Sequence, residues 1–151
     1  MKTTILCFAA FAGMLFTTSA EIPDSLMLAL QKKAPEKLEV KVVKVSEKQH
    51  VRGQTITVNF EVVAEVAAVE SSLTELKAGD RILIKYRIYR GKIPPGSYPA
   101  SLKEGESYKA YLGPKKGDGR VDVVQNLPVY SPAAARGSFE LSAAQNAEAK
   151  P

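Results

Sequence analysis

The feature that most constrains this fold is the run of residues 55–70, "TITVNFEVVAEVAAVE", in which every even position from Ile56 to Ala68 is apolar. A period of two predicts a β-strand with one buried face, and this run is roughly three times as long as a typical strand. A strand of this length has to coil, so that its two ends serve different neighbours. Burying each large side chain of the apolar face stabilises the fold by roughly 1.5–3 kcal/mol before entropy is subtracted. That face carries Ile56, Val58, Phe60, Val62, Ala64, Val66 and Ala68, and the opposite face carries Thr55, Thr57, Asn59, Glu61 and Glu65.

A second alternating segment precedes this run. Residues 38–46, "LEVKVVKVS", have the same period, and the doubled Val42–Val43 predicts a β-bulge that re-phases the strand. Residues 47–54, "EKQHVRGQ", are polar apart from Val51 and Gly53, so we expect them to form a long hairpin loop between the first two strands.

Three more strands are expected further along the chain. Residues 81–89, "RILIKYRIY", follow a turn signal at Gly79–Asp80. Residues 102–114, "LKEGESYKAYLGP", alternate in the same way, and "KKGDG" then predicts a hairpin turn. Residues 120–125, "RVDVVQ", are expected to supply the fifth and last strand.

These five strands predict an all-β domain, preceded by one short N-terminal helix. We expect a five-stranded Greek-key barrel of the oligonucleotide/oligosaccharide-binding (OB) type over residues 37–126, because closure leaves no exposed edge strand. A seven-stranded sandwich is the main alternative, but only five segments show convincing strand periodicity.

The first twenty residues have the layout of a secretory signal peptide. Lys2 precedes an apolar run over residues 5–16, and small side chains follow it, so we expect cleavage between Ala20 and Glu21. The apolar run is shorter than the roughly 20 residues that a membrane-spanning helix needs. The sequence therefore predicts a secreted or periplasmic protein with no transmembrane segment after cleavage, and a retained anchor is the alternative.

Two segments flank the predicted barrel. Residues 21–36 are expected to form a helix or a mobile arm, and residues 127–141 an ordered C-terminal loop over the domain. Residues 142–151 are small and polar, which predicts a disordered tail. The apolar residues of the two flanking segments are Leu26, Met27, Leu30, Val129, Tyr130 and Phe139.

Net charge and cysteine content limit the kinds of partner and site that the expected mature chain can have. The formal net charge of +5 becomes +4 when Lys2 is removed, which is compatible with anionic partners and equally with simple solubility. The single cysteine, Cys7, lies inside the predicted signal peptide. Disulfides, thiolate metal sites and cysteine nucleophiles are therefore excluded from the expected mature chain.

Three motifs resemble the barrel of netrin-like modules and tissue inhibitors of metalloproteinases, as found also in bacterial secreted proteins. They are "VVAEVAAV", "LKAGDRILIKY" and the pattern L-x-x-G-x-x-Y-x-A-Y-L from Leu102 to Leu112, and the resemblance covers residues 38–126. It implies the OB barrel. Those inhibitors chelate the protease metal through an N-terminal cysteine, whereas the expected first residue here is Glu21, so that activity is not implied.

The basic stretch "RIYRGKIPPGSYP", residues 87–99, and the end of the strand before it form the best candidate site. Basic groups interleaved with an aromatic ring are what OB-type barrels use to hold polyanions. A charged strand end followed by a proline-rich connection is the alternative interpretation. The residues expected to bind are Lys85, Arg87, Tyr89, Arg90 and Lys92.

No motif of the sequence indicates an enzyme, a cofactor or a metal site. His50 is the only histidine and lies in a polar stretch without neighbouring metal ligands. We expect a non-catalytic binding or assembly module that engages a protein partner. Binding of an anionic envelope glycan or lipid headgroup is the alternative, an envelope hydrolase with a cleft around His50 is a third hypothesis, and nucleic acid is not expected for a secreted protein.

Overall fold

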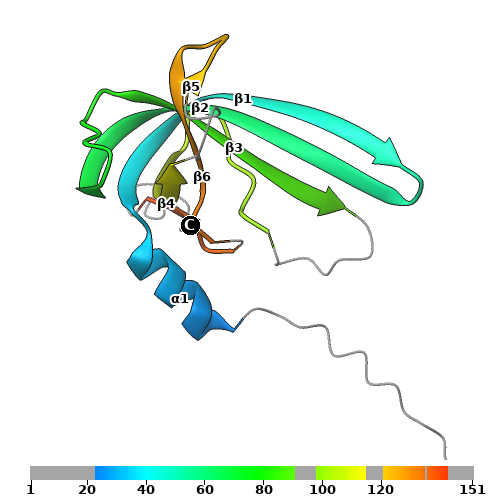
Figure 1. The fold of residues 1–151 in the computed structure, drawn as a ribbon, viewed down its shortest axis with the longest axis horizontal. Coiled ribbons are helices and arrows are strands. Elements are labelled where there is room, and N and C mark those ends of the chain that lie inside the picture. Colours follow the sequence, from blue (N-terminus) through cyan, green and yellow to red (C-terminus); the bar gives the residue numbers. More distant parts are fainter. Residues whose placement is uncertain (1–22, 91–97, 115–120, 135, 143–151) are drawn as a thin grey trace, which may run out of the picture.

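The structure is a computed structural model that describes residues 23–90, 98–114, 121–134 and 136–142. The chain is mostly β-structure with one short helix, as the sequence predicted (Figure 1). No helix among these residues is both long and apolar enough to span a membrane. The elements are α1 (Asp24–Lys33), β1 (Glu36–Arg52), β2 (Thr55–Ser72), β3 (Arg81–Arg90), β4 (Ser107–Pro114), β5 (Val121–Asp122), β6 (Leu127–Pro132) and β7 (Phe139–Leu141).

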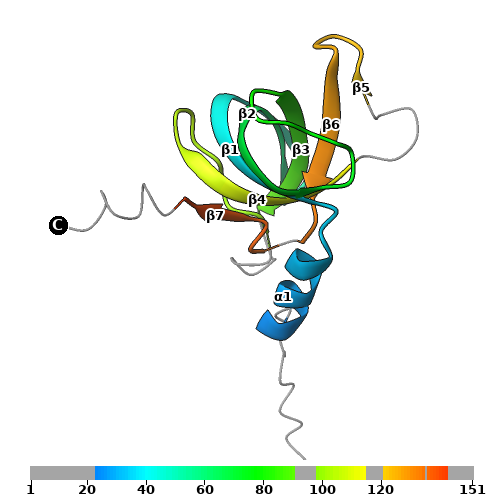
Figure 2. The same cartoon turned by 90° about the vertical axis from the view of Figure 1, so that its left-hand side faces the viewer.

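The strands form one mixed sheet that closes on itself. Its order is β5-β6-β3-β2-β1-β4-β7, so there are seven strands instead of the five expected. An additional pairing of β6 with β4 joins β1, β2, β3, β6 and β4 into a ring (Figure 2). The β3–β6 pairing is parallel, and the other pairings are antiparallel.

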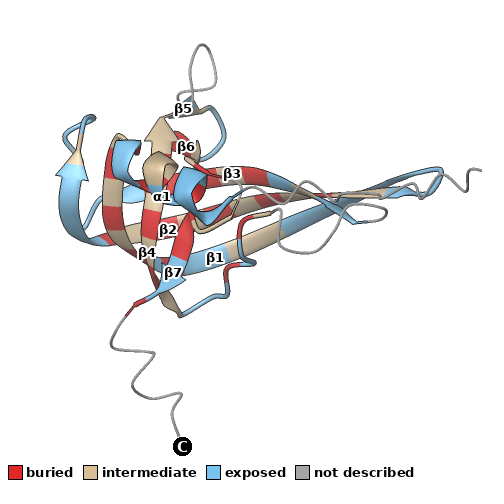
Figure 3. Ribbon diagram, turned by 90° about the horizontal axis from the view of Figure 1, so that it is seen from below, coloured by how far each residue is buried: buried red, intermediate tan, exposed pale blue. Residues whose placement is uncertain are grey.

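The core lies inside this ring. The even-numbered residues of β2 from Val58 to Val66 are buried, as the alternation predicted, whereas Ala68 is exposed. Ile82 and Ile84 of β3 and Leu112 of β4 meet them, each with no exposed surface. Figure 3 shows this burial concentrated where the strands encircle the core, while the far ends of β1 and β2 are exposed.

The prediction that residues 120–125 supply the closing strand is wrong. The described part of that segment contains only the short strand β5, and Val123 and Val124 after it are 95% and 93% exposed. The Asp122 carboxylate accepts the backbone N–H groups of Val124 (3.1 Å) and Gln125 (2.9 Å), which bends the chain into a turn. Asn126 then adopts a φ of +51°.

The strand that completes the ring is β6, within the segment expected to be an ordered loop. Its Val129 and Tyr130 are buried and pair with Leu83 and Ile84 of β3. Pro128 and Pro132 made the segment look unlike a strand, because proline cannot donate to a ladder. The strand tolerates both prolines because its pairings with β3, β4 and β5 are each only two or three residues long.

The hairpin of β1 and β2 is longer than predicted. Val43 is skipped in the register, which confirms the bulge expected from the doubled valine. The prediction of a loop over residues 47–54 is wrong, because the two strands stay paired as far as Arg52 and Thr55. Only Gly53 and Gln54 form the turn, with Gly53 at a φ of +59°.

Helix α1 lies outside the ring, at the end where β1 begins (Figure 1). Of the expected apolar contacts, Met27 is buried, whereas Leu26 is 49% exposed. The buried Gln31 holds the helix in place, since its Nε2 donates to the carbonyl of Gly137 and to Glu140 Oε1 (3.0 Å).

Candidate interaction surface

Three strands continue beyond the ring as a sheet that we call the projecting sheet, made of residues 46–52 of β1, 55–61 of β2 and 85–90 of β3 (Figure 1). Strand β4 pairs with β1 only as far as Lys41, and β6 pairs with β3 only at Leu83 and Ile84. The projecting sheet therefore has open edges along both β1 and β3, within the described residues.

The inner side of the projecting sheet is packed near the ring along β2 and β3, whereas residues 47–52 of β1 are exposed. The Tyr86 ring stacks on Phe60, with ring centroids 4.8 Å apart and planes 6° from parallel. Its hydroxyl donates to the carbonyl of Ala100 (3.3 Å) and accepts the backbone N–H of Leu102 (3.4 Å). Burial raises the pKa of Tyr86 to about 12, so the hydroxyl stays protonated and keeps this segment in contact with the sheet.

The outer side is open and gathers basic side chains from different strands. Residues directly opposite one another in paired strands point to the same face of a sheet. The cross-strand rows of the outer side, read from β1 to β3, are Ser46–Glu61–Lys85, Lys48–Asn59–Arg87 and His50–Thr57–Tyr89, with Arg52–Thr55 at the tip.

Lys85, in the row nearest the ring, is held by two carboxylates. Its Nζ lies 3.2 Å from Glu61 Oε1 and 2.7 Å from Asp122 Oδ2. The hydrogen bond to Asp122 is the main reason that the pKa of Lys85 is raised, and Lys85 in turn lowers the pKa of Asp122. Lys85 thus connects the β5 turn to β3 and is not a free cation.

The guanidinium of Arg87 is oriented along the sheet surface. Its Nε donates to Asn59 Oδ1 (2.8 Å), and its Nη1 donates to the Tyr89 hydroxyl (3.3 Å). A shallow depression of about 520 Å³ runs over these side chains and Lys48. Because Arg87 meets only neutral groups in these contacts, its charge stays available to an anion.

We call the outer side beyond the Glu61 row the distal basic face. Its residues are Lys48, His50, Arg52, Thr55, Thr57, Asn59, Arg87 and Tyr89. This set contains three permanent cations and no carboxylate. Cations gathered without a counter-charge repel one another, and an anionic partner relieves that repulsion.

The structure brings together three of the five residues that the sequence singled out. Lys85, Arg87 and Tyr89 share the outer side, although Lys85 is already paired. Arg90 lies opposite Ile56 in a row of the inner side, because successive residues of a strand face opposite ways. Lys92 falls outside the described residues.

Sequence reasoning missed the contribution of β1 to this face. Lys48, His50 and Arg52 recur at every second position, which is strand periodicity of basic instead of apolar residues. That signal was present in the stretch interpreted as a loop. It went unrecognised because both sides of the projecting sheet are exposed along this part of β1.

His50 is an exposed residue of β1, opposite Thr57. The described residues contain no group of three or more His, Cys, Asp or Glu side chains arranged to hold a metal ion. The catalytic hypothesis around His50 gains no geometric support from this open strand position.

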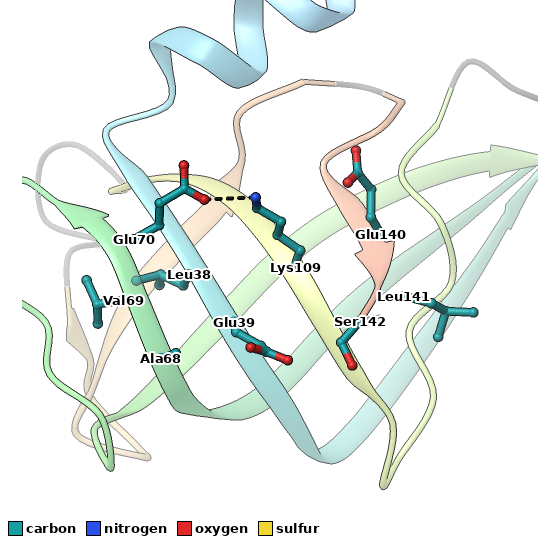
Figure 4. Close-up of a pocket in the computed structure, with 9 residues that line it drawn as sticks. All are labelled: Leu38, Glu39, Ala68, Val69, Glu70, Lys109, Glu140, Leu141 and Ser142. Atoms are coloured by element: carbon teal, nitrogen blue, oxygen red, sulfur yellow. Dashed lines mark ion pairs between the residues drawn. The ribbon is translucent and has the colours of Figure 1, made fainter. Parts of the chain in front are cut away.

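A second hollow, of about 540 Å³, lies at the other end of β1 and β2 (Figure 4). Lys109 of β4 pairs there with Glu70 (2.8 Å), and this contact lowers the pKa of Glu70. Glu140 of β7 accepts a hydrogen bond from Gln31. The remaining lining residues are Leu38, Glu39, Ala68, Val69, Leu141 and Ser142.

This hollow differs from the distal basic face in charge. Figure 4 shows Glu39, Glu70 and Glu140 around Lys109, so carboxylates outnumber ammonium groups among the residues drawn. The one cation present is already paired with Glu70. An anionic partner is therefore disfavoured here, and the two ends of β1 and β2 have opposite electrostatic character.

Comparison of the chain with protein-family models, with curated proteins and with solved structures gave no significant match.

Proposed function

We propose that this protein is a secreted or periplasmic, non-catalytic binding module that engages an acidic partner through the distal basic face. The observation that carries the proposal is the row Lys48–Asn59–Arg87, in which two cations from different strands flank a neutral amide on an exposed face. A protein with an acidic surface is the first choice of partner. An anionic envelope glycan or lipid headgroup is the alternative, and it would use the same cations.

We further propose that the ring is an OB-type barrel, as the resemblance to netrin-like modules implies. The support is the order of connections, which runs from a long hairpin to a third strand, then through a crossing segment to a fourth strand and a closing strand. OB barrels bind ligands on the face of their second and third strands and on adjoining loops. The distal basic face includes residues of both β2 and β3.

The first test is a binding assay with probes of defined chemistry. Polyglutamate, heparin and phosphatidylglycerol vesicles represent acidic protein, anionic glycan and anionic lipid. We expect retention on at least one of these at low salt, and its loss as ionic strength rises, because exposed charge contacts are screened. Preference for polyglutamate would favour the protein partner.

The deciding variant is Lys48→Ser with Arg87→Ser, which removes two charges from the distal basic face. The matched control is Lys32→Ser with Lys33→Ser, which removes the same charge from the exposed end of α1. We expect the first pair to weaken low-salt binding about tenfold, because two exposed contacts of roughly 0.7 kcal/mol each sum to about 1.4 kcal/mol, and the control to keep it. Equal loss in both variants would show that net charge, and not this face, governs binding.

A further inference from the structure

The outer edge of β1 within the projecting sheet is a row of backbone groups without a strand beside it. At the ring, the Val42 N–H donates to the carbonyl of Glu106 and the Val42 carbonyl accepts from Gly105, both at 2.9 Å. After the bulge, the Val45 N–H donates to Glu104 Oε1 (2.7 Å). These contacts lie on the side of β1 away from β2.

Further along β1, every second residue again has its backbone groups on the side away from β2. Backbone groups alternate sides in an antiparallel pair, so from Val45 onward the groups of Glu47, Gln49 and Val51 face outward. The turn leads to the same assignment. The residues that flank a two-residue hairpin turn, Arg52 and Thr55, bond to each other, so the backbone groups of Arg52 face β2 and those of Val51 face outward. Within the described residues these outward groups have no backbone partner.

Exposed edges are commonly blocked by proline, by a bulge or by shortness. Residues 46–52 contain no proline, and the bulge at Val43 lies before them. Protection instead comes from charge, since Lys48 and Arg52 point to the outer side along this edge. Positive charge along the edge repels basic strands and attracts acidic ones, so it selects an acidic partner instead of excluding all partners.

We propose that residues 46–52 of β1 accept an extended acidic segment of a partner protein as an additional strand. Its backbone bonds to the outward groups of Glu47, Gln49 and Val51, and every second side chain is a carboxylate beside Lys48 and Arg52. The residues between them are uncharged, because they meet Glu47, Gln49 and Val51 on the inner side, and a further carboxylate there would lie beside Glu47. This inference rests on the proposed function and names the binding mode.

Pairing of this edge with a second copy of the same edge is disfavoured. An antiparallel β1–β1 pair would bring Lys48 and Arg52 of one chain beside the same basic face of the other. Like charges opposite each other in a sheet are destabilising. The electrostatics thus favour a partner of different sequence.

The test uses the purified protein and two synthetic peptides, acetyl-Val-Glu-Val-Glu-Val-Glu-amide and its counterpart with lysine in place of glutamate. We expect the acidic peptide to slow amide hydrogen exchange at Glu47, Gln49 and Val51, and the basic peptide to have no effect. Protection that is absent at these three amides, while the peptide binds, would overturn the strand-addition mode.

Gln49→Pro sharpens the test, because proline removes an outward N–H without removing a bond to β2. Gln49→Ala is the matched control. We expect the proline variant to weaken acidic-peptide binding about tenfold and the alanine variant to stay within about twofold, which corresponds to about 1.4 kcal/mol for the first.

The two proposals fail in different ways. Undiminished binding by Gln49→Pro, combined with loss in the Lys48→Ser, Arg87→Ser variant, would overturn strand addition and leave the basic face as the binding site. Undiminished binding by both variants would overturn the proposed function as well. The exchange pattern of the unmodified protein decides the matter independently if the proline variant fails to fold.

Discussion

The ring and the projecting sheet share the strands β1, β2 and β3, yet they have opposite properties. Inside the ring, Val62 of β2 and Ile84 of β3 are fully buried. Further along the same strands, Arg87 and Tyr89 are exposed, and so is all of β1 beyond Ser46. The difference is that β4 and β6 close the ring but do not continue along the projecting sheet.

We infer from this comparison that the ring stabilises the fold and that the projecting sheet is the region suited to binding. Closure supplies each ring strand with two neighbours and a shared core, which stabilises the fold. The projecting sheet is packed on the inner side of β2 and β3 through Phe60 and Tyr86, while its outer side and its β1 edge stay open. A strand that is already paired on one side is suited to binding, because less conformational entropy is lost when a partner arrives.

The largest contrast is expected between core and edge truncations. Ile84→Ala removes a fully buried side chain from the ring and should lower the free energy of unfolding by about 2–5 kcal/mol. Val51→Ala truncates an exposed side chain of the projecting sheet and should change it by less than about 0.5 kcal/mol. Urea unfolding measures both, and similar losses in the two variants would contradict the division.

Two glycines with positive φ extend the comparison at a smaller scale. At Gly137, with a φ of +74°, an added Cβ would lie 2.9 Å from Gln31 Nε2, so Gly137→Ala should cost more than the roughly 1–2 kcal/mol of backbone strain alone. It should also loosen α1, because Gln31 holds the helix. At Gly53, with a φ of +59°, no atom lies within 4 Å, so Gly53→Ala should cost only the strain.

The measurement for the glycine pair is thermal unfolding together with proteolysis of α1. Faster cleavage of the helix in Gly137→Ala than in Gly53→Ala is expected. Equal stability and equal cleavage would show that Gln31 does not fix the helix.

The smallest stability effect is expected from Asp122→Asn, which removes the ion pair between the β5 turn and Lys85. The pKa of Asp122 is lowered by Lys85, so the stabilisation is present above the ordinary value of 3.8 and is lost as pH falls through the lower folded value. The difference between the parent and the variant should therefore be clear at pH 7 and shrink below pH 4. Urea midpoints at pH 7 and pH 3 check this, and a difference that grows in acid would have the wrong sign.

The sequence predicted those parts of the fold in which burial imposes a pattern. Residues Val58 to Val66 alternate because one side faces the core, and the bulge at Val43 followed from two adjacent valines. The closing strand was missed because the prolines of β6 suppress strand character and are tolerated only through its short pairings. No local signal contains that information, since it depends on strands distant in sequence.

The candidate site was predicted on β3 and missed on β1 for a related reason. Arg87 and Tyr89 follow a clearly alternating apolar strand, so their shared face could be inferred. Lys48 and Arg52 lie where neither side of β1 is buried, so the apolar residues there do not alternate and give no signal of a strand. The ion pair of Lys85 with Asp122 could not be predicted either. Asp122 lies at a turn, whereas the sequence predicted a continuous strand over residues 120–125.

The most direct test of the division between ring and projecting sheet is residue-resolved amide hydrogen exchange of the unliganded protein. Along β1, slow exchange is expected at Lys48 and His50, whose N–H groups face β2, and fast exchange at Glu47, Gln49 and Val51, whose N–H groups face outward. Ring amides such as that of Val62 should be slowest. Uniformly slow exchange over residues 46–52 would mean that the edge is already covered, and uniformly fast exchange would mean that the projecting strand is not formed. Either result would contradict a preformed strand with an open edge.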